Sequence, residues 1–289
     1  MTDRYGVMGH PIGHSKSPFI HARFAEQTGQ SMAYLAMHVL PGTFASAIAT
    51  FQAEGGKGLS ITLPFKEEAK ALVDMLTPRA RRANAVNTIR FNELGGKYGD
   101  NTDGIGLIQD LRINHNISIE GQRILLLGAG GAARGIVNPL LDERPEQLVI
   151  ANRTPEKAVA LVAQCLSEAG VQENSIKGCG LGELGSASFD LIINATSASL
   201  AGEIPPLPDS ILRTNGGCYD LMYDVARPTA FVLWGRQHDA AKSVDGLGML
   251  VEQAAEAFYY WRGIRPNTMP VIAALRNSSV GEELVDTNK

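Results

Sequence analysis

The sequence predicts an α/β protein in which short strands and helices alternate and build mainly parallel sheets. Three observations predict this class. Apolar runs alternate with segments of helical spacing through the N-terminal third, and the alternation restarts near Gly121. The run at 123–127 is almost wholly apolar, which is typical of a strand buried on both faces. The 289 residues, 44% of them hydrophobic, are enough for two domains of ordinary size.

The elements of the first third follow from local patterns. Short apolar runs predict three strands, at 5–8, 33–39 and 58–63. Helical spacing predicts two helices, at 18–28 and 44–53. The third strand runs into a loop at Pro64. Because ligands of parallel sheets gather beyond the carboxyl ends of the strands, the polar residues after these strands are candidate site residues.

The second part of the chain repeats the pattern. After the strand at 123–127 come a glycine-rich turn and a helix, and further strands are predicted at 148–151, 189–194 and 217–221. Beyond Gly246 the spacing is helical again, with Leu250, Ala254 and Phe258 on one face. This last segment is a candidate to pack back on the first domain, which would make that domain discontinuous.

Composition and charge exclude several classes of protein. Lys and Arg number 26 and Asp and Glu 30, a net charge of −4 without the broad basic field of a nucleic-acid binder. The N-terminal residues lack a secretory signal, and no apolar run approaches the ~18 residues of a membrane span. The three cysteines match no disulfide framework or zinc knuckle, and His10 and His14 form no helical metal pair. We therefore expect a cytoplasmic protein with a small-molecule substrate, no nucleic-acid or membrane partner and no metal.

A glycine-rich turn predicts a dinucleotide site. The segment 128–133, Gly-Ala-Gly-Gly-Ala-Ala, directly follows a predicted strand and precedes a helical stretch. Gly128 permits the tight turn, Gly130 lets the backbone approach a pyrophosphate, and Ala133 keeps the helix close to the sheet. The N-terminus of the helix offers free N–H groups and the positive end of its dipole.

The next strand favours NADP over NAD. Enzymes that use NAD usually carry Asp or Glu at its end, where the carboxylate binds the ribose 2′-hydroxyl. Here the strand ends in Asn152, Arg153 and Thr154, without an acid. The guanidinium of Arg153 suits the 2′-phosphate of NADP. The alternative is a solvated surface arginine at a strand end.

Polar residues after the first and third strands suggest a second site. Ser15 and Ser17 precede Pro18, so their hydroxyl and N–H groups are candidates to hold an anion at a helix start. The alternative is an N-cap with a spare serine. Thr62 and Lys66 follow the third strand, where a ligand would lie. The alternative for Lys66 is a surface lysine ahead of a helix.

Two more polar segments, 84–88 and 99–104, contain Asn, Thr and Asp. These residue types also cap helices and form turns, which is the alternative for each segment. Taken together, serine and asparagine groups suit a polyol, and a lysine with an aspartate can transfer or organise a proton.

Eight segments resemble the signature segments of the shikimate dehydrogenase family. They are GHPIGHSKSP, ITLPFKE, AVNT, GDNTDG, GAGGAARG, ANRT, INATS and DGLGMLVEQAAEAF, in family order and over nearly the whole chain. The resemblance implies an α/β catalytic domain at 1–103, an inserted Rossmann NADP-binding domain at 104–246, and C-terminal helices at 247–289 that pack back on the catalytic domain. It also implies reversible, NADP-linked oxidation of shikimate in aromatic amino-acid biosynthesis, by a monomer or homodimer.

The resemblance also implies roles for matched residues. Substrate-binding residues would be Ser15, Ser17, Thr62, Lys66, Asn87, Asp103, Tyr223 and Gln253. Lys66 and Asp103 would be the catalytic pair. Cofactor-binding residues would be Gly128, Ala129, Gly130, Gly131, Ala132, Asn152, Arg153, Thr154, Thr196, Gly246 and Met249. The chain departs from many relatives at 227–230, where Arg-Pro-Thr-Ala replaces a Thr-Pro sequence at the outer wall of the cleft.

Two rival functions stay open. One is a quinate/shikimate dehydrogenase that accepts NAD as well as NADP, against which Arg153 and the missing acid count. The other is a catalytically silent NADP-binding regulator, against which the intact Lys66 and Asp103 count.

Overall fold

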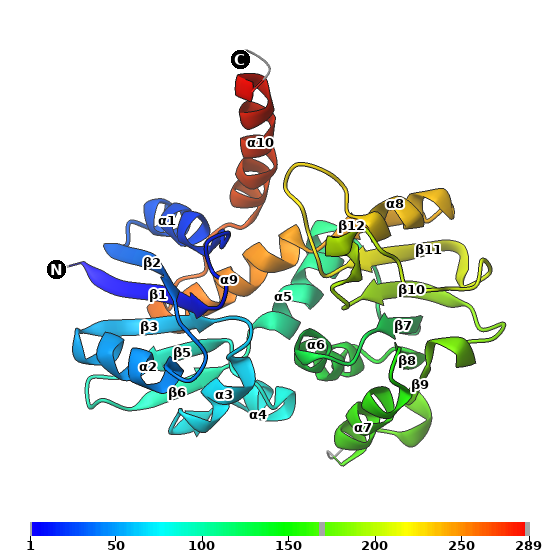
Figure 1. Cartoon of the computed structure of the whole chain (residues 1–289), viewed down its shortest axis with the longest axis horizontal. Coiled ribbons are helices and arrows are strands. Elements are labelled where there is room, and N and C mark those ends of the chain that lie inside the picture. The colour runs from blue at the N-terminus through cyan, green and yellow to red at the C-terminus, as the bar shows by residue number, and fades with distance from the viewer. Residues whose placement is uncertain (1, 168–170, 287–289) are drawn as a thin grey trace. The chain divides into compact units, whose positions relative to one another are not determined.

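The computed structural model describes residues 2–167 and 171–286, without the side chains of residues 200 and 278–286. The chain divides into two compact units, each with its own six-stranded sheet. The first unit comprises Met1–Gly106 and Val251–Val271, and the second comprises Leu107–Leu250 and Ile272–Lys289. The domain limits expected from the sequence, 1–103, 104–246 and 247–289, stay a prediction. Figure 1 labels the elements of both units.

The sheet of the first unit has the order β2-β1-β3-β5-β6-β4. Its strands are β1 (Asp3–Gly9), β2 (Met32–His38), β3 (Gly56–Ile61), β4 (Met75–Leu76), β5 (Thr88–Phe91) and β6 (Lys97–Asp100). The pairings of β1 with β2 and β3 and of β4 with β6 are parallel, whereas β5 runs antiparallel to both its neighbours. The predicted mainly parallel sheet is confirmed, with one antiparallel hairpin added.

Helices cover both faces of this sheet (Figure 1). They are α1 (Ser17–Thr28), α2 (Phe44–Ala53), α3 (Lys66–Ala71), α4 (Pro78–Ala83) and the second part of α9 (Leu247–Arg262). Phe44 and Phe51 of α2 pack with Leu59 of β3 in one buried cluster. On α1, His21 stacks against Tyr34 of β2. The predicted helices and the first three strands are therefore present, within one or two residues of their expected ends.

The short strands β4, β5 and β6 were not predicted. The segments 84–88 and 99–104 contain residues that favour turns, yet Thr88 begins β5 and Asp100 ends β6. Ser60 of β3 pairs with Thr88, and Thr88 pairs with Asp100, so β3 acts as the template for the hairpin. Pairing with a neighbouring strand overrides weak local preference.

The sheet of the second unit is wholly parallel, in the order β12-β11-β10-β7-β8-β9. Its strands are β7 (Arg123–Leu127), β8 (Gln147–Asn152), β9 (Ile176–Gly180), β10 (Phe189–Asn194), β11 (Leu212–Asp220) and β12 (Lys242–Asp245). Numbered from β7, this is the order 3-2-1-4-5-6 of dinucleotide-binding sheets. The chain reverses its winding between β7 and β10, which is where such sheets bind ligands.

The second unit contains several helical segments. They are α5 (Asp103–Gln109), which begins in the first unit, a π-helical turn (Asp110–Asn114), α6 (Gly131–Asp142), α7 (Pro155–Leu166), α8 (Ala230–Gln237), the first turn of α9, and α10 (Met269–Asp286) beyond Val271. Alternate residues of β7 enter different cores: Ile124 packs with α6 and α7, and Leu125 packs with α8. The expected strand buried on both faces is confirmed.

The predicted C-terminal helix is α9, which begins at Leu247. On the face expected to be apolar, Ala254 and Phe258 are buried. Among the described helices none is both long and apolar enough to cross a membrane. Within the described ranges there is also no group of three or more His, Cys, Asp or Glu side chains that could hold a metal ion.

Candidate active site

Lys66 and Asp103 form an ion pair in the first unit. Lys66 is the first residue of α3, and Asp103 is the first residue of α5. The distance from Lys66 Nζ to Asp103 Oδ2 is 2.6 Å, and the two side chains are 19% and 9% exposed. Since the pair is largely withdrawn from water, its attraction is stronger than that of a surface pair. The alternative of Lys66 as a plain surface lysine is wrong.

Asn87 lies against the same carboxylate. Its Nδ2 donates to Asp103 Oδ1 at 2.8 Å and to Thr102 Oγ1 at 3.0 Å. Its Oδ1 accepts from the Thr102 N–H and from Thr88 Oγ1, both at 2.9 Å. These four contacts fix the orientation of the amide, because donors and acceptors cannot be exchanged without losing them. Gln253 of α9 reaches the cluster through Thr102 Oγ1, at 3.4 Å.

Strand pairing explains why these residues meet. The Ile61 N–H at the carboxyl end of β3 donates to the Asn87 carbonyl at 2.7 Å, and the Val86 N–H donates to the Lys66 carbonyl at 2.8 Å. The Asn87 N–H in turn donates to the Asp100 carbonyl at 3.0 Å. The start of β5 and the end of β6 therefore both lie at the carboxyl end of β3, from which the chain runs on to Lys66.

Ser15, Ser17 and Thr62 lie in the loops after β1 and β3. Ser17 begins α1 and is 8% exposed, and its N–H donates to Ser15 Oγ at 3.3 Å. Lys16 precedes the helix without a side-chain cap, and the contact of Ser15 Oγ with the Ser17 N–H is compatible with both a helix cap and an anion site. The His10 N–H donates to the Leu63 carbonyl at 2.9 Å, which holds the two loops together. Ser15, Ser17 and Thr62 therefore lie at the same edge of the sheet, the edge at which the chain leaves β3 and continues to Lys66.

Tyr223 belongs to the second unit and follows β11. Its side chain is half-buried. Burial raises the pKa of its phenol, and the charge of Asp245 raises that pKa further. The hydroxyl is therefore a hydrogen-bond donor and not an anion at neutral pH.

The glycine-rich turn has the geometry expected of a dinucleotide site. Gly128 has a φ of +104°, and a Cβ there would lie 3.2 Å from the Ala195 carbonyl oxygen. Gly130 is the N-cap of α6 and Gly131 its first residue. A Cβ on either glycine would meet no atom of the described residues within 4 Å. The backbone at the start of α6 is therefore open on the side of these two Cβ positions, and a helix N-terminus of this kind suits an anionic pyrophosphate. Ala132 lies in the first turn of α6, while Ala129 and Ala133 are buried.

The end of β8 carries the three residues expected near the adenosine phosphate. Asn152 Nδ2 donates to the Thr154 carbonyl at 2.9 Å, and Thr154 is the N-cap of α7. Arg153 is exposed between them. An exposed guanidinium at this position is compatible with a 2′-phosphate ligand and with a solvated arginine.

The other predicted cofactor residues follow β10 and β12. Thr196 Oγ1 donates to Asn194 Oδ1 at 2.7 Å. The Gly246 N–H donates to the Met222 carbonyl at 3.2 Å, and a Cβ on Gly246 would lie only 2.4 Å from the Leu221 carbonyl oxygen. Only glycine fits there without a shift of the backbone. Met249 packs against the core that lines β7.

The departing segment 227–230 starts a helix. Thr229 is the N-cap of α8 and accepts the Val232 N–H, while its hydroxyl donates to Asp220 Oδ2 at 2.6 Å. Arg227 forms an exposed ion pair with Asp224 at 3.4 Å. The threonine of this segment is therefore fixed by a cap that any helix start can use.

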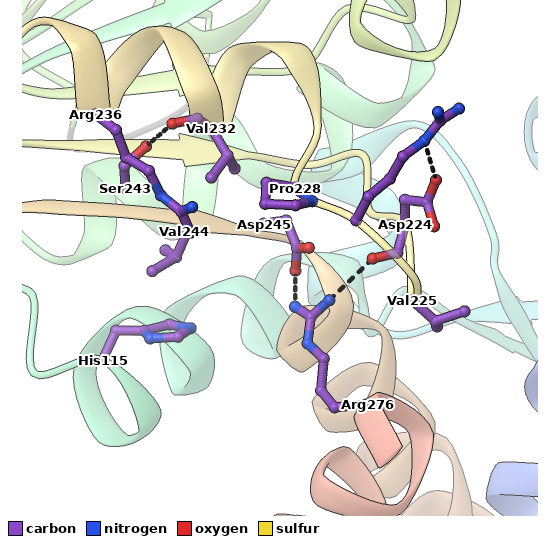
Figure 2. A pocket seen from close by; sticks show the side chains of 11 residues that line it. His115, Asp224, Val225, Pro228, Val232, Arg236, Ser243, Val244, Asp245 and Arg276 are labelled. Carbon is purple, nitrogen blue, oxygen red and sulfur yellow. Dashed lines mark hydrogen bonds and ion pairs between the residues drawn. The ribbon is translucent and has the colours of Figure 1, made fainter. Parts of the chain in front are cut away.

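A cavity of about 280 Å³ lies beside this segment, within the second unit (Figure 2). Its walls include His115, Arg236 and the edge strand β12. Arg276 of α10 crosses it and donates to the Asp224 carbonyl at 3.0 Å and to the Asp245 carboxylate. The cavity thus lies against β12, an edge strand, whereas the glycine-rich turn follows the central strand β7.

Thr102 was missed among the predicted site residues. It contacts both Asn87 and Gln253 and is completely buried. The signal was present, because Thr102 lies inside the segment 99–104 that the sequence singled out. Its residue type alone does not distinguish a hydroxyl that contacts site residues from a turn residue.

Known proteins match this chain over nearly its whole length. The chain is 56% identical over 276 residues to the shikimate dehydrogenase (NADP(+)) of Nitrosococcus oceani, which covers 96% of both chains. The chain belongs to the shikimate dehydrogenase family. The enzyme of the same name from Alkalilimnicola ehrlichii is 55% identical, over 96% of this chain and 99% of that one.

Family profiles match both units of this shikimate dehydrogenase family member. Residues 7–89 match the shikimate dehydrogenase substrate binding domain. Residues 111–207 match shikimate / quinate 5-dehydrogenase, and residues 246–276 match the shikimate 5'-dehydrogenase C-terminal domain.

Solved structures of the family have the same fold. Shikimate 5-dehydrogenase from Thermus thermophilus, in complex with NADP(H) and shikimate, superposes with a TM-score of 0.82 at 31% identity, over 96% of this chain and 99% of that one. The Ael1 enzyme from Pseudomonas putida superposes with a TM-score of 0.86 at 42% identity, over 95% and 98%.

Proposed function

We propose that this chain catalyses the reversible, NADPH-dependent reduction of 3-dehydroshikimate to shikimate. The observation that carries the proposal is the buried contact of 2.6 Å between the Lys66 ammonium and the Asp103 carboxylate, with Asn87 donating to the second oxygen. A proton donor suits reduction of a ketone, and a fixed carboxylate and an oriented amide suit binding of the hydroxyl groups of a polyol. Relatives at 55–56% identity that carry the name shikimate dehydrogenase (NADP(+)) support it.

The residues of the second unit fit NADP. The open backbone at Gly130 and Gly131 suits a pyrophosphate, and the exposed Arg153 suits a 2′-phosphate. Ala129, Ala132, Asn152, Thr154, Thr196, Gly246 and Met249 complete the proposed set. Bound NADPH would supply the hydride that reduces the substrate carbonyl.

Lys66 and Asp103 carry the proton chemistry of the proposal. The Lys66 ammonium donates a proton to the oxygen of the carbonyl as negative charge develops there. Asp103 orients Lys66, and accepts a hydrogen bond from a ring hydroxyl of the substrate. In the direction of oxidation, neutral Lys66 takes the proton of the substrate hydroxyl. Asp103 as the formal acid is the alternative.

The remaining residues bind the substrate in this proposal. Ser15, Ser17 and Thr62 hold the carboxylate by hydroxyl and N–H groups. Asn87 and Gln253 hold ring hydroxyls, and the un-ionised phenol of Tyr223 donates a further hydrogen bond. We place the enzyme in the cytoplasm as a monomer or homodimer. Its three cysteines are buried and form no disulfide, which suits a reducing compartment.

Parallel assays of NADP⁺ and NAD⁺ reduction on shikimate and quinate test the function. We expect a much higher kcat/KM for shikimate with NADP⁺. The second candidate function is oxidation of quinate as well, because the profile matching 111–207 is described for both substrates. Comparable efficiency on quinate would support that candidate, and absence of any turnover would support a silent regulator.

The variant Arg153→Ala extends the assay to the cofactor. We expect it to weaken NADP⁺ binding about ten- to a hundredfold and to leave NAD⁺ binding unchanged, since a charge-assisted contact contributes roughly 1.5–3 kcal/mol. The control is Arg112→Ala, an exposed arginine of the same unit that pairs with Glu143. Equal weakening of both cofactors would contradict the role of Arg153.

A further inference from the structure

A buried ion network in the first unit joins β6 to α9. Arg79 of α4 donates to both oxygens of Asp100, from Nε to Oδ1 at 2.7 Å and from Nη2 to Oδ2 at 2.5 Å. Its third nitrogen, Nη1, donates to Glu256 Oε1 at 2.8 Å. The side chain of Asp100 is fully buried and that of Glu256 is 10% exposed. One guanidinium therefore binds two buried carboxylates from different elements.

Each of these carboxylates is linked to a proposed site residue, Asp100 to Asp103 through Asn101 and Glu256 to Gln253 along α9. Asp100 Oδ1 accepts the Asn101 N–H at 2.8 Å, and Asn101 Oδ1 accepts the Asp103 N–H at 3.1 Å. Glu256 follows Gln253 by three residues on α9, and residues at this spacing share a helix face. The network thus reaches the backbone of Asp103, whose carboxylate holds Lys66, and the helix that carries Gln253.

The network continues beyond Glu256. Arg265 Nη1 donates to Glu256 Oε2 at 2.6 Å, and its Nη2 donates to Glu252 Oε2 at 3.1 Å. Thr268 Oγ1 donates to Glu252 Oε1 at 2.6 Å. Two carboxylates flanking Gln253 on α9 are therefore both fixed, and rotation or sliding of this helix would break several charged contacts at once.

Energetics argue that this network does more than add stability. Burying charges costs desolvation that their attraction only partly offsets, and apolar residues of similar volume often stabilise a core as well or better. What a guanidinium adds is geometry, because its planar fork binds two carboxylates at fixed angles. Burial lowers the pKa of Arg79, but the hydrogen bonds and charges of Asp100 and Glu256 outweigh burial and raise it, so Arg79 stays charged.

We propose that Arg79 is a positioning residue: by holding Asp100 and Glu256 it sets where Asp103 and Gln253 stand relative to Lys66. Arg79 acts through these carboxylates and not on the substrate. The inference rests on the proposed function, because it assigns a task to residues of that site. A displacement of about 1 Å in such a cluster is enough to lower a rate by a large factor.

Arg79→Lys is the test, with Arg262→Lys as its matched control. Arg262 is also an arginine of the first unit; it pairs with Asp3 and donates from Nε to Gln30 Oε1 at 2.8 Å. Lysine keeps the charge in both variants and loses the fork. Both variants should lose thermal stability, whereas only Arg79→Lys should lower kcat for shikimate, by at least about tenfold, with KM for NADP⁺ unchanged.

An activity-independent readout separates the inference from the proposed function. The side-chain amide of Asn87 donates to Asp103, so its NMR signals report the geometry of that contact. They should shift in Arg79→Lys and stay in place in Arg262→Lys. If the wild type oxidised no shikimate, the proposed function would fail, and the Asn87 signals would still decide the inference.

Glu256→Gln is the second variant. It keeps the shape of the side chain and the Arg79–Asp100 pair, and it removes one charge of the network. We expect the same direction of change in kcat and in the Asn87 signals. If Arg79→Lys did not fold, the kcat and the Asn87 signals of Glu256→Gln alone would test the positioning role of Arg79. Values of kcat and Asn87 signals equal to those of Arg262→Lys in every folded variant would overturn the inference.

Discussion

The ion pair of Lys66 and Asp103 offsets the free-energy cost of withdrawing both charges from water. A largely buried ammonium without its carboxylate would be an unpaired charge withdrawn from water, and the carboxylate without the ammonium would keep only neutral donors such as Asn87. Each member of the pair therefore stabilises the burial of the other. Two substitutions separate the roles of its members.

Lys66→Ala should lower kcat by about 10²–10⁴-fold, the usual effect of losing a positioned acid–base group. Shikimate binding should suffer less, because Ser15, Ser17 and Asn87 remain. The control is Lys70→Ala, a lysine of the same helix that donates to Asn84 instead. Steady-state kinetics with a direct shikimate titration measure both effects. If folded Lys66→Ala kept a near-normal kcat, Lys66 would not be the proton donor, and Asp103 or water would have that role.

Asp103→Asn should differ from Lys66→Ala by weakening shikimate binding as well as kcat. An amide at this position cannot accept from Lys66, Asn87 and a ring hydroxyl in the way that a carboxylate does. The same titration measures the difference. Equal shikimate affinity in both variants would contradict a contact between Asp103 and the substrate.

At the scale of the element, the turn between β7 and α6 combines two different demands on glycine. Gly128 adopts a positive φ of +104°, which a residue with a side chain adopts only under strain. Gly130 has an ordinary φ of −87°, and a Cβ there would meet no described atom within 4 Å. The fold therefore requires glycine at position 128, whereas at position 130 it would accept a side chain. A requirement for glycine at position 130 would come from the ligand alone.

Gly130→Ala should accordingly keep the thermal stability of the protein and weaken NADP⁺ binding. We expect Kd to rise at least about tenfold, or ~1.4 kcal/mol, because the added methyl occupies the approach of the pyrophosphate. Gly182→Ala, at another open glycine of the same unit, is the control. Calorimetric titration of NADP⁺ with thermal unfolding distinguishes the effects. Unchanged NADP⁺ affinity would remove Gly130 from the proposed cofactor site.

At the scale of the whole molecule, the free energy of unfolding should depend on pH through His21, a residue to which the sequence analysis assigns no role in the site. Burial lowers the pKa of His21 from 6.5 to about 3. Neither ring nitrogen has a hydrogen-bond partner among the described residues, and the ring stacks on Tyr34 with 4.1 Å between centroids. Between these pKa values only the unfolded chain binds the proton. Lowering the pH from 6.5 toward 3 therefore lowers the free energy of unfolding, by about 1.4 kcal/mol per pH unit.

His21→Phe should remove this dependence, since a phenyl ring keeps the stacking and binds no proton. Between about pH 6.5 and about pH 5, the wild type should lose ~1–2 kcal/mol more than the variant. Trp261 contacts His21 in the first unit, whereas Trp234 lies in the second unit. In a Trp234→Phe background, urea unfolding followed by the fluorescence of Trp261 therefore reports the unfolding of the first unit. The exposed His14, changed to Gln, is the control. Parallel pH profiles of wild type and His21→Phe would refute the assignment.

The sequence by itself determined the elements that carry strong local signals. The apolar run of β7, the glycines of the turn after it and the helical spacing of α2 each specify their structure within a few residues. Gly128 is informative because only glycine adopts its φ without strain, and 123–127 because a wholly apolar strand must be covered on both faces. The segments that resemble the family, in family order, also single out Lys66 and Asp103 without any structural distance.

Only the tertiary structure decided what depends on strand pairing and on distant charges. The hairpin of β5 and β6 is short and is flanked by segments rich in Asn, Thr and Asp, and it pairs with the edge that β3 offers. Arg79 and Glu256 are 177 positions apart and look like surface residues in the sequence. Their meeting is a property of the fold, because burial and partnership of a charge depend on which elements pack together, and local spacing carries no information about that.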